Sequence, residues 1–152
     1  MIQLKRILLV EDSSYDAELT LEAFTEYKLA NEVALVMDGE EALDYLYRKG
    51  RYTERPEGNP AVILLDLKLP KINGLEVLQR IKSDDSLKFI PVVVLTSSQE
   101  ESDKTKSYNL GVNAYVVKPI DFHKFTDALK ILGAFWAVLN EPPTGCIGRM
   151  DT

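Results

Sequence analysis

Three acidic residues, Glu11, Asp12 and Asp66, each follow a short run of apolar residues. The first two come after residues 6–10, and Asp66 comes directly after residues 61–65. Runs of this length, rich in Val, Ile and Leu, are typical of strands that are buried on both faces. In an open parallel sheet, ligands bind outside the carboxyl ends of the strands. The three carboxylates are therefore candidates for chemistry.

Thr96 and Lys118 occupy equivalent positions. Thr96 closes the run 89–96, and Lys118 follows the run 113–117. Taken one at a time, such residues are typical of turns and helix caps. Because parallel strands end along one edge of a sheet, we expect both side chains to lie near the acidic group. Their joint occurrence favours a functional site.

Three carboxylates brought together repel one another and call for a compensating cation. Oxygen ligands of this kind suit Mg²⁺, and Mg²⁺ with Lys118 would balance the three negative charges. This balance indicates phosphoryl transfer to a carboxylate, in which the protein contributes positioning and charge neutralisation. Asp66 would attack the phosphoryl group, and the Thr96 hydroxyl would form a hydrogen bond to one of its oxygens.

Strand and helix patterns alternate along the chain and must position these residues. The expected strands are residues 6–10, 32–37, 61–65, 89–96 and 113–117. The expected helices are residues 14–27, a helix marked by 42–47 and stopped by Gly50, then 74–81, a helix from Ser97 and Ser98 to Gly111, and 121–139. Five such units predict an α/β, flavodoxin-like (βα)5 fold, a doubly wound five-stranded parallel sheet with helices on both faces.

Two local features refine this outline. Ser13 is expected to cap the first helix, with Asp16 three residues later, and residues 97–98 stand at the capping distance from residues 100–101. Residues 51–60 are polar, with two prolines and a glycine, and form a longer connection than is usual in such folds. This segment is interpreted as an insertion.

Composition limits the class of protein. The 152 residues, 45% of them hydrophobic, predict one domain at residues 1–140 and a loosely ordered tail at 141–152. The net charge of −6 argues against nucleic-acid binding. The first apolar run is too short for a signal peptide or membrane span, so we expect a cytoplasmic protein. Cys146 is the only cysteine in the sequence and His123 is the only histidine, which argues against a cysteine- or histidine-based zinc site.

Four segments carry a resemblance to a known family: "ILLVEDS", "VILLDLKLPKINGLEVL", "IPVVVLTSS" and "GVNAYVVKPI". With them, residues 5–139 resemble the receiver domain of two-component response regulators. The resemblance implies that Asp66 accepts a phosphoryl group from a phosphohistidine on a sensor histidine kinase. It also implies that Glu11, Asp12, Asp66 and the backbone carbonyl of Lys68 surround Mg²⁺. The expected reactions are the protein's own phosphorylation and dephosphorylation, without turnover of a small molecule.

The same resemblance implies a conformational switch. Thr96 and Tyr115 match the family's switch pair, in which the hydroxyl moves toward the phosphoryl group and the aromatic ring turns inward. A cis peptide before Pro119 would aim Lys118 into the site. Lys68 and Ser98 occupy positions at which the family tunes autodephosphorylation.

The subfamily is indicated by the loop at 51–60, the opening "EDSSYDAELTLEAF" and the long last helix. These features resemble the small single-domain regulators paired with bacterial phytochrome histidine kinases. Glu11 stands where many members of the family have Asp, which lengthens that ligand by one methylene.

The last expected helix, residues 121–139, has an apolar arc wider than packing on one sheet requires. One explanation is that the tail folds over it. The hypothesis favoured here is a homodimer through this helix, since exposed aromatic residues would otherwise form an apolar patch. The candidate residues are Phe122, Ile131, Phe135, Trp136 and Val138.

Three other functions fit the sequence less well. A flavin-binding protein of similar fold would hold phosphate at its first turn, where this chain is acidic. An aspartyl phosphatase would normally carry a second acid two residues after the nucleophile, where this chain has Lys68. A non-phosphorylated pseudo-receiver, acting as a protein-interaction module, usually lacks one of the site residues, and this chain has all of them.

Overall fold

The computed structural model describes residues 6–26, 33–118, 124 and 127. Its elements, in chain order, are β1 (Ile7–Val10), α1 (Ser14–Glu26), β2 (Val33–Val36), α2 (Gly39–Tyr47), the short 3₁₀ helix η2 (Gly50–Tyr52), β3 (Val62–Leu65), α3 (Gly74–Ser83), β4 (Val92–Thr96), α4 (Glu101–Asn109) and β5 (Ala114–Val117). The five strands form one parallel sheet in the order β2-β1-β3-β4-β5. This order confirms the predicted flavodoxin-like α/β fold.

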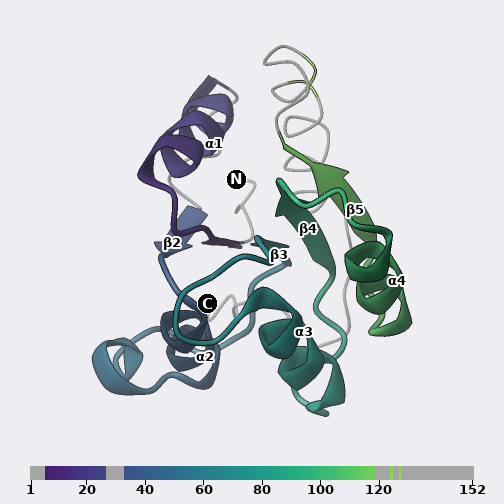
Figure 1. Ribbon diagram of the computed structural model, residues 1–152. Coiled ribbons are helices and arrows are strands. Elements are labelled where there is room, and N and C mark those ends of the chain that lie inside the picture. The colour runs from purple at the N-terminus through teal and green to yellow at the C-terminus, as the bar shows by residue number, and fades with distance from the viewer. Residues whose placement is uncertain (1–5, 27–32, 119–123, 125–126, 128–152) are drawn as a thin grey trace.

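Both faces of the sheet are covered, which explains the unbroken apolar runs. In β1, Leu8 and Val10 pack in one core with residues of α2 and α3. The alternate residues, Ile7 and Leu9, pack in a second core with Phe24 of α1. Figure 1 shows α1 on one side of the sheet, α2 and α3 on the other, and α4 beside β5. Every residue of β1, β3 and β4 is buried, as the runs predicted.

The two predicted helix caps have different outcomes. Ser13 Oγ accepts a hydrogen bond from the Asp16 N–H at 3.2 Å, which confirms the cap of α1. The expected start of the fourth helix at Ser97 and Ser98 is wrong, because α4 begins at Glu101. The hydroxyl of Ser98 instead donates to Asp103, inside the helix, at 2.6 Å.

The insertion between α2 and β3 packs against α2. The second helix ends before Gly50, because Arg48 adopts a left-handed conformation with φ of 56° and closes α2. Farther along the segment, Arg55 is buried, and its Nε donates to the backbone carbonyl of Tyr45 at 2.9 Å. These contacts attach the insertion to α2.

Several predictions lie outside the described residues. They are the last helix at 121–139 apart from residues 124 and 127, the peptide before Pro119, the tail at 141–152, His123, Cys146, and the dimer candidates Phe122, Ile131, Phe135, Trp136 and Val138. Among the described residues, no helix has the length and apolar character needed to cross a membrane.

Candidate functional site

The sheet itself positions the polar residues at its carboxyl edge. The N–H of Glu11 donates to Val36 in β2, at 3.0 Å, and the N–H of Asp66 donates to Val10 in β1, at 3.1 Å. On the other side, the N–H of Lys118 donates to the carbonyl of Thr96 at 2.8 Å. Backbone pairing thus continues for one residue past the strands and fixes where each side chain begins.

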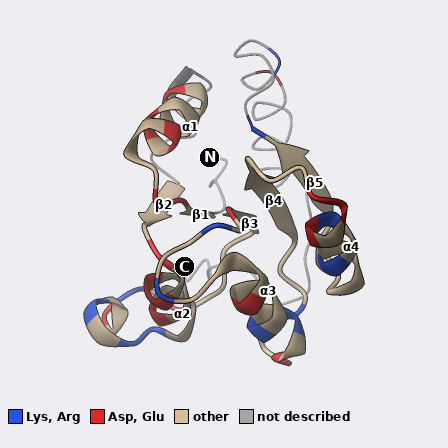
Figure 2. Cartoon of the chain, in the orientation of Figure 1, with Lys and Arg blue, Asp and Glu red and all other residues tan. Residues whose placement is uncertain are grey.

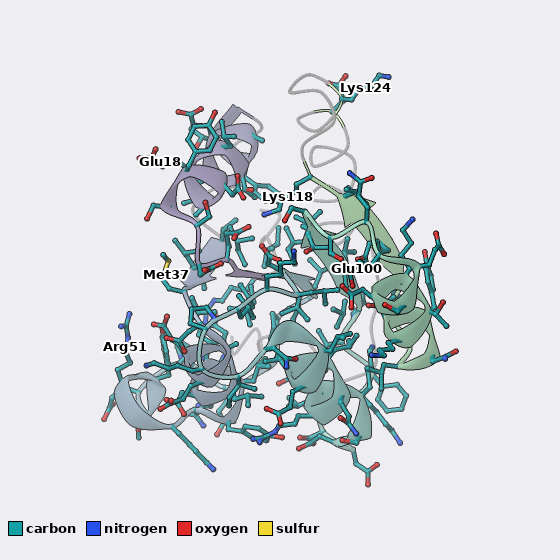
Figure 3. The ribbon with its side chains drawn as sticks, in the orientation of Figure 1. Glu18, Met37, Arg51, Glu100, Lys118 and Lys124 are labelled. Atoms are coloured by element: carbon teal, nitrogen blue, oxygen red, sulfur yellow. The ribbon has the colours of Figure 1, made fainter. Side chains whose placement is uncertain are left out.

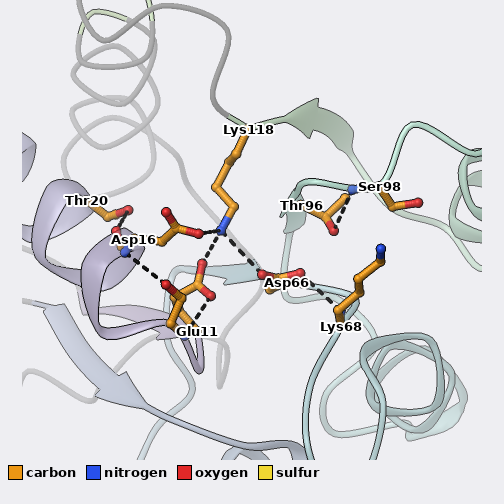
Figure 4. A network of polar contacts seen from close by, with 9 residues as sticks. Glu11, Asp16, Thr20, Asp66, Lys68, Thr96, Ser98 and Lys118 are labelled. Carbon is orange, nitrogen blue, oxygen red and sulfur yellow. Dashed lines mark hydrogen bonds and ion pairs between the residues drawn. The ribbon is translucent and has the colours of Figure 1, made fainter.

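The ammonium of Lys118 lies among three carboxylates (Figure 4). Its Nζ lies 3.0 Å from Asp16 Oδ2 and 3.3 Å from Asp66 Oδ2, and it also contacts Glu11 Oε1. Lys118, Glu11 and Asp66 are buried, whereas 29% of the Asp16 side chain is exposed. The structure therefore brings together Lys118 and two acids expected at this site, and adds Asp16.

Glu11, Asp12 and Asp66 form a group whose ligand atoms all lie within 4.8 Å of one another. Figure 2 shows acidic residues at the ends of β1 and β3. Carboxylates at this spacing suit a hard divalent cation. Asp12 is exposed while the other two are buried, so the group has one member open to solvent. The donor set fits the cation that the sequence predicted.

Burial and charge oppose each other at this site. Burial raises the pKa of Glu11 to about 7, although the hydrogen bond and charge of Lys118 act to lower it. Burial alone would lower the pKa of Lys118, but the hydrogen bonds and charges of Glu11, Asp66 and Asp16 together outweigh burial and raise that pKa. Lys118 therefore remains an ammonium at neutral pH and can compensate negative charge.

The segment after β3 orients Asp66. The N–H of Lys68 donates to Asp66 Oδ1 at 3.0 Å, while Oδ2 faces Lys118. Close by, the N–H of Gly74 donates to the carbonyl of Leu67 at 2.9 Å, which holds the start of α3 against this segment. The carboxylate is thus held on both of its oxygens.

Ser98 links Thr96 and Tyr115, the expected switch pair, to α4. Thr96 is fully buried, and its hydroxyl accepts the N–H of Ser98 at 3.3 Å. The Tyr115 hydroxyl donates to the carbonyl of Ser98 at 2.9 Å. The Ser98 hydroxyl donates to Asp103 Oδ2 at 2.6 Å and accepts the N–H of Glu100 at 3.4 Å. A single residue therefore connects the strand end, the aromatic ring and the helix.

Asp16 is a functional candidate that the sequence analysis did not identify, because its spacing from Ser13 indicated a helix cap. Its distance from Ser13 suited a capping box, and its backbone N–H is indeed capped. Its carboxylate, however, points toward Lys118 (Figure 4). The available signal was its place in the first turn of a helix that starts at the strand-end edge.

Comparison with known proteins gives a consistent picture. Residues 7–130 match the family model described as the response regulator receiver domain. The chain is 42% identical over 132 residues to the response regulator Rcp1 of Synechocystis sp., covering 87% of this chain and 88% of Rcp1. The crystal structure of the Mn²⁺-bound form of Rcp1 is also similar to this chain, with a TM-score of 0.82 and 40% sequence identity. The alignment covers 92% of this chain and 99% of the Rcp1 chain.

Two further solved structures are similar. The phosphorylated cyanobacterial phytochrome response regulator RcpA has a TM-score of 0.82 and 43% identity, with 92% of this chain and 99% of RcpA covered. The bacteriophytochrome response regulator RtBRR has a TM-score of 0.76 and 66% identity, with 95% and 87% covered. With its doubly wound sheet and acidic strand ends, the chain belongs to the response regulator receiver domain family of two-component signalling.

Proposed function

We propose that Asp66 accepts a phosphoryl group from a phosphohistidine on a sensor histidine kinase. The observation that carries this proposal is the Asp66 carboxylate, held 3.3 Å from the Lys118 ammonium within a group of further acids. A carboxylate oxygen of Asp66 bonds to phosphorus as the bond from phosphorus to the histidine nitrogen breaks. The electron pair of that bond goes to the histidine nitrogen, and a proton on the other ring nitrogen lets the imidazole leave as a neutral ring.

The neighbouring residues supply positioning and charge. The N–H of Lys68 fixes the carboxylate through Oδ1, and the Lys118 ammonium neutralises charge on the phosphoryl oxygens. A hydroxyl that accepts one hydrogen bond can still donate its own proton. Thr96 can therefore accept the Ser98 N–H and donate to a phosphoryl oxygen.

Glu11, Asp12 and Asp66, together with the backbone carbonyl of Lys68, would hold Mg²⁺. This assignment is supported by the spacing of the three carboxylates. When bound there, Mg²⁺ supplies charge neutralisation for the transferred phosphoryl group. Lys118 alone cannot balance the acids that surround it, so phosphorylation should require the divalent ion.

Thr96 and Tyr115 would report the phosphorylation of Asp66. The support is the shared contact with Ser98, because a hydroxyl drawn toward the phosphoryl group would pull on the segment to which Tyr115 is bonded. The same segment is bonded to α4 through Asp103. The switch would thus reach α4 and the surface beside β5.

The proposed partner is a phytochrome-type histidine kinase. RcpA and RtBRR are phytochrome and bacteriophytochrome response regulators, and their similarity to this chain supports the same pairing. Such a kinase delivers its phosphoryl group in the cytoplasm, which is the proposed location of this protein. The receiver domain would cover residues 1–140, with residues 141–152 as a loosely ordered tail.

A homodimer through residues 121–139 is a separate proposal that rests on the apolar pattern of the sequence. Light scattering on the intact protein and on Phe135→Glu tests it. A dimer that dissociates in the variant is expected. An intact protein that is monomeric at high micromolar concentration would exclude this dimer.

The experiment that tests the phosphoacceptor is incubation with acetyl phosphate and Mg²⁺, followed by intact mass spectrometry. The expected result is a gain of one phosphoryl group that is lost in Asp66→Asn and in EDTA. Asp85→Asn, which changes an exposed acid, is the matched control and should still gain the group. A wild-type protein that gains nothing would favour the non-phosphorylated interaction module.

A further inference from the structure

Lys118 contacts carboxylates that come from three different elements. Glu11 follows β1, Asp66 follows β3, and Asp16 lies in the first turn of α1. Glu11 and Asp66 belong to the acidic group proposed to hold a divalent cation, whereas Asp16 does not. Glu11 and Asp66 therefore pair with the Lys118 ammonium and also belong to the proposed metal site.

An ammonium and a dication compete for these carboxylates, because like charges at contact distance repel strongly in a buried site. Occupation of the metal site requires Lys118 to weaken its contacts with Glu11 and Asp66. A buried ammonium without a carboxylate is costly. Asp16 is the contact that Lys118 can keep.

The position of Asp16 suits this role. Its backbone is fixed by the bond from its N–H to Ser13 Oγ and by the hydroxyl of Thr20, which donates to the Asp16 carbonyl at 2.9 Å. Its carboxylate lies 3.0 Å from Lys118 Nζ, closer than that of Asp66. A rigid helix thus presents a carboxylate beside the ammonium and outside the proposed group of metal ligands.

The geometry points to Asp16 as a positioning residue that holds Lys118 when the metal site is occupied. Because Asp16 still pairs with the Lys118 ammonium after the cation binds, the free-energy cost of cation binding is smaller. The same contact keeps the ammonium beside Asp66 for the incoming phosphoryl group. This inference rests on the proposed metal site and adds a residue to it. Asp16 acts through Lys118 and does not contact the metal.

The direct test is isothermal titration calorimetry with Mg²⁺ on the full chain. Asp16→Asn is expected to weaken Mg²⁺ binding by about tenfold, the lower range for residues that orient metal ligands. Glu18→Gln is the matched control, because it removes the same charge from an exposed position two residues away on α1. Figure 3 shows Glu18 on the side of α1 away from Lys118. The control should bind Mg²⁺ within about twofold of the wild type, since exposed charges are screened.

A double-mutant cycle separates action through Lys118 from a direct effect of charge. In a Lys118→Met background, Asp16→Asn should have no larger effect than Glu18→Gln. An unchanged tenfold loss in that background would overturn the inference, because Asp16 would then act on the cation without Lys118. Equal affinities of Asp16→Asn and Glu18→Gln in the otherwise native chain would overturn it as well.

A second variant guards against a loss of folding. Asp16→Glu keeps the carboxylate and should bind Mg²⁺ more tightly than Asp16→Asn, and circular dichroism verifies the fold of both variants. An Asp16→Glu affinity no better than that of Asp16→Asn would contradict the role of the carboxylate. A wild-type chain that does not bind Mg²⁺ would instead refute the proposed metal site, so the two failures are distinguishable.

Discussion

At the scale of single residues, Gly74 lies where the start of α3 meets the segment that carries Asp66. A Cβ built at Gly74 would overlap the backbone carbonyl of Asp66 and the Cα of Leu67. We therefore expect Gly74→Ala to push this segment away, to lower the free energy of unfolding by about 1–3 kcal/mol, and to slow phosphorylation of Asp66. Urea denaturation and intact mass after timed incubation with acetyl phosphate measure the two effects.

The control for this prediction is Gln79→Ala, an exposed position on the same helix. It should change the free energy of unfolding by less than about 0.5 kcal/mol and leave the rate of phosphorylation unchanged. A Gly74→Ala protein with native stability would mean that the close contact between α3 and the Asp66 segment is absent in solution.

The location of the site residues was predictable because parallel strands end at one edge. Glu11, Asp66 and Lys118 each follow an apolar run, so their meeting required only the strand pattern. The partners of Lys118 were harder to predict. Asp16 and Ser98 have residue types and spacings that also cap helices, and local sequence does not determine whether such a side chain bonds its own helix or a distant group.

At the scale of elements, the insertion between α2 and β3 depends on a buried arginine. Arg55 donates to the carbonyl groups of Tyr45, Pro56 and Gly58 at 2.9, 3.1 and 2.9 Å, and its guanidinium lies 4.4 Å from the centre of the Tyr45 ring. Burial lowers the pKa of Arg55, but the group remains a cation at neutral pH. The planar set of N–H donors on Arg55 forms hydrogen bonds with backbone carbonyl groups that would otherwise lack these donors.

We expect Arg55→Lys to lower the free energy of unfolding by about 1–3 kcal/mol, because an ammonium cannot reproduce the donor geometry and leaves the partly buried carbonyl groups of Pro56 and Gly58 without their arginine donor. Urea denaturation measures this loss. Arg51→Lys is the matched control, since the Arg51 side chain is 74% exposed and pairs with Glu41 at 3.2 Å. Equal stabilities of the two variants would contradict an anchoring role for Arg55.

The helix α4 is attached mainly by polar contacts. Ser107 is its one buried residue, and all residues of α4 are described. Both signs of charge occur along it (Figure 2). Helices with few buried apolar contacts open at low free-energy cost. The hydrogen bond from Ser98 to Asp103 therefore contributes a large share of what holds the start of this helix.

Removing that bond should loosen α4 selectively. Ser98→Ala is expected to lower the free energy of local opening in α4 by about 1 kcal/mol, read as faster amide exchange across Glu101–Asn109. The bond from Tyr115 goes to the backbone of Ser98 and is retained. Ser83→Ala, which removes a hydroxyl bonded within α3, should leave α4 unchanged. Unaltered exchange in α4 after Ser98→Ala would contradict the attachment.

Element types were largely predictable, because the apolar runs and helical spacings were strong. Boundaries were less predictable where polar residues decide them. Arg48 ends α2 in a left-handed conformation, two residues before the Gly50 that the sequence pattern expected to stop the helix, and α4 begins later than its serines indicated. In both places, hydrogen bonds of the folded chain accompany the boundary, from the Arg48 N–H to the Tyr45 carbonyl and from the Ser98 hydroxyl to Asp103. Local sequence does not determine which of these bonds form.

At the scale of the whole molecule, parallel connectivity concentrates acidic charge at one edge of the sheet. Glu11, Asp12, Asp16 and Asp66 come from two strand ends and one helix, and Lys118 balances only one of their charges. Folding must bring these carboxylates together against their repulsion. A divalent cation bound by the folded chain relieves that repulsion, so the stability of the molecule should depend on Mg²⁺.

By linkage, Mg²⁺ at about 100 times its Kd should add about 2.7 kcal/mol to the free energy of unfolding. For a chain of this size, that corresponds to a rise in Tm of about 5–10 °C.

Asp12 is the exposed member of the acidic group. Asp12→Asn should therefore leave the Tm in EDTA within about 2 °C of the wild type but remove most of the rise with Mg²⁺. Differential scanning calorimetry in EDTA and in Mg²⁺ at constant ionic strength measures both. Asp85→Asn, with a side chain that is 96% exposed, should keep the full rise. A full rise in Asp12→Asn would show that the stabilising cation binds elsewhere, because a group that loses one of three carboxylates cannot keep its affinity for a hard dication.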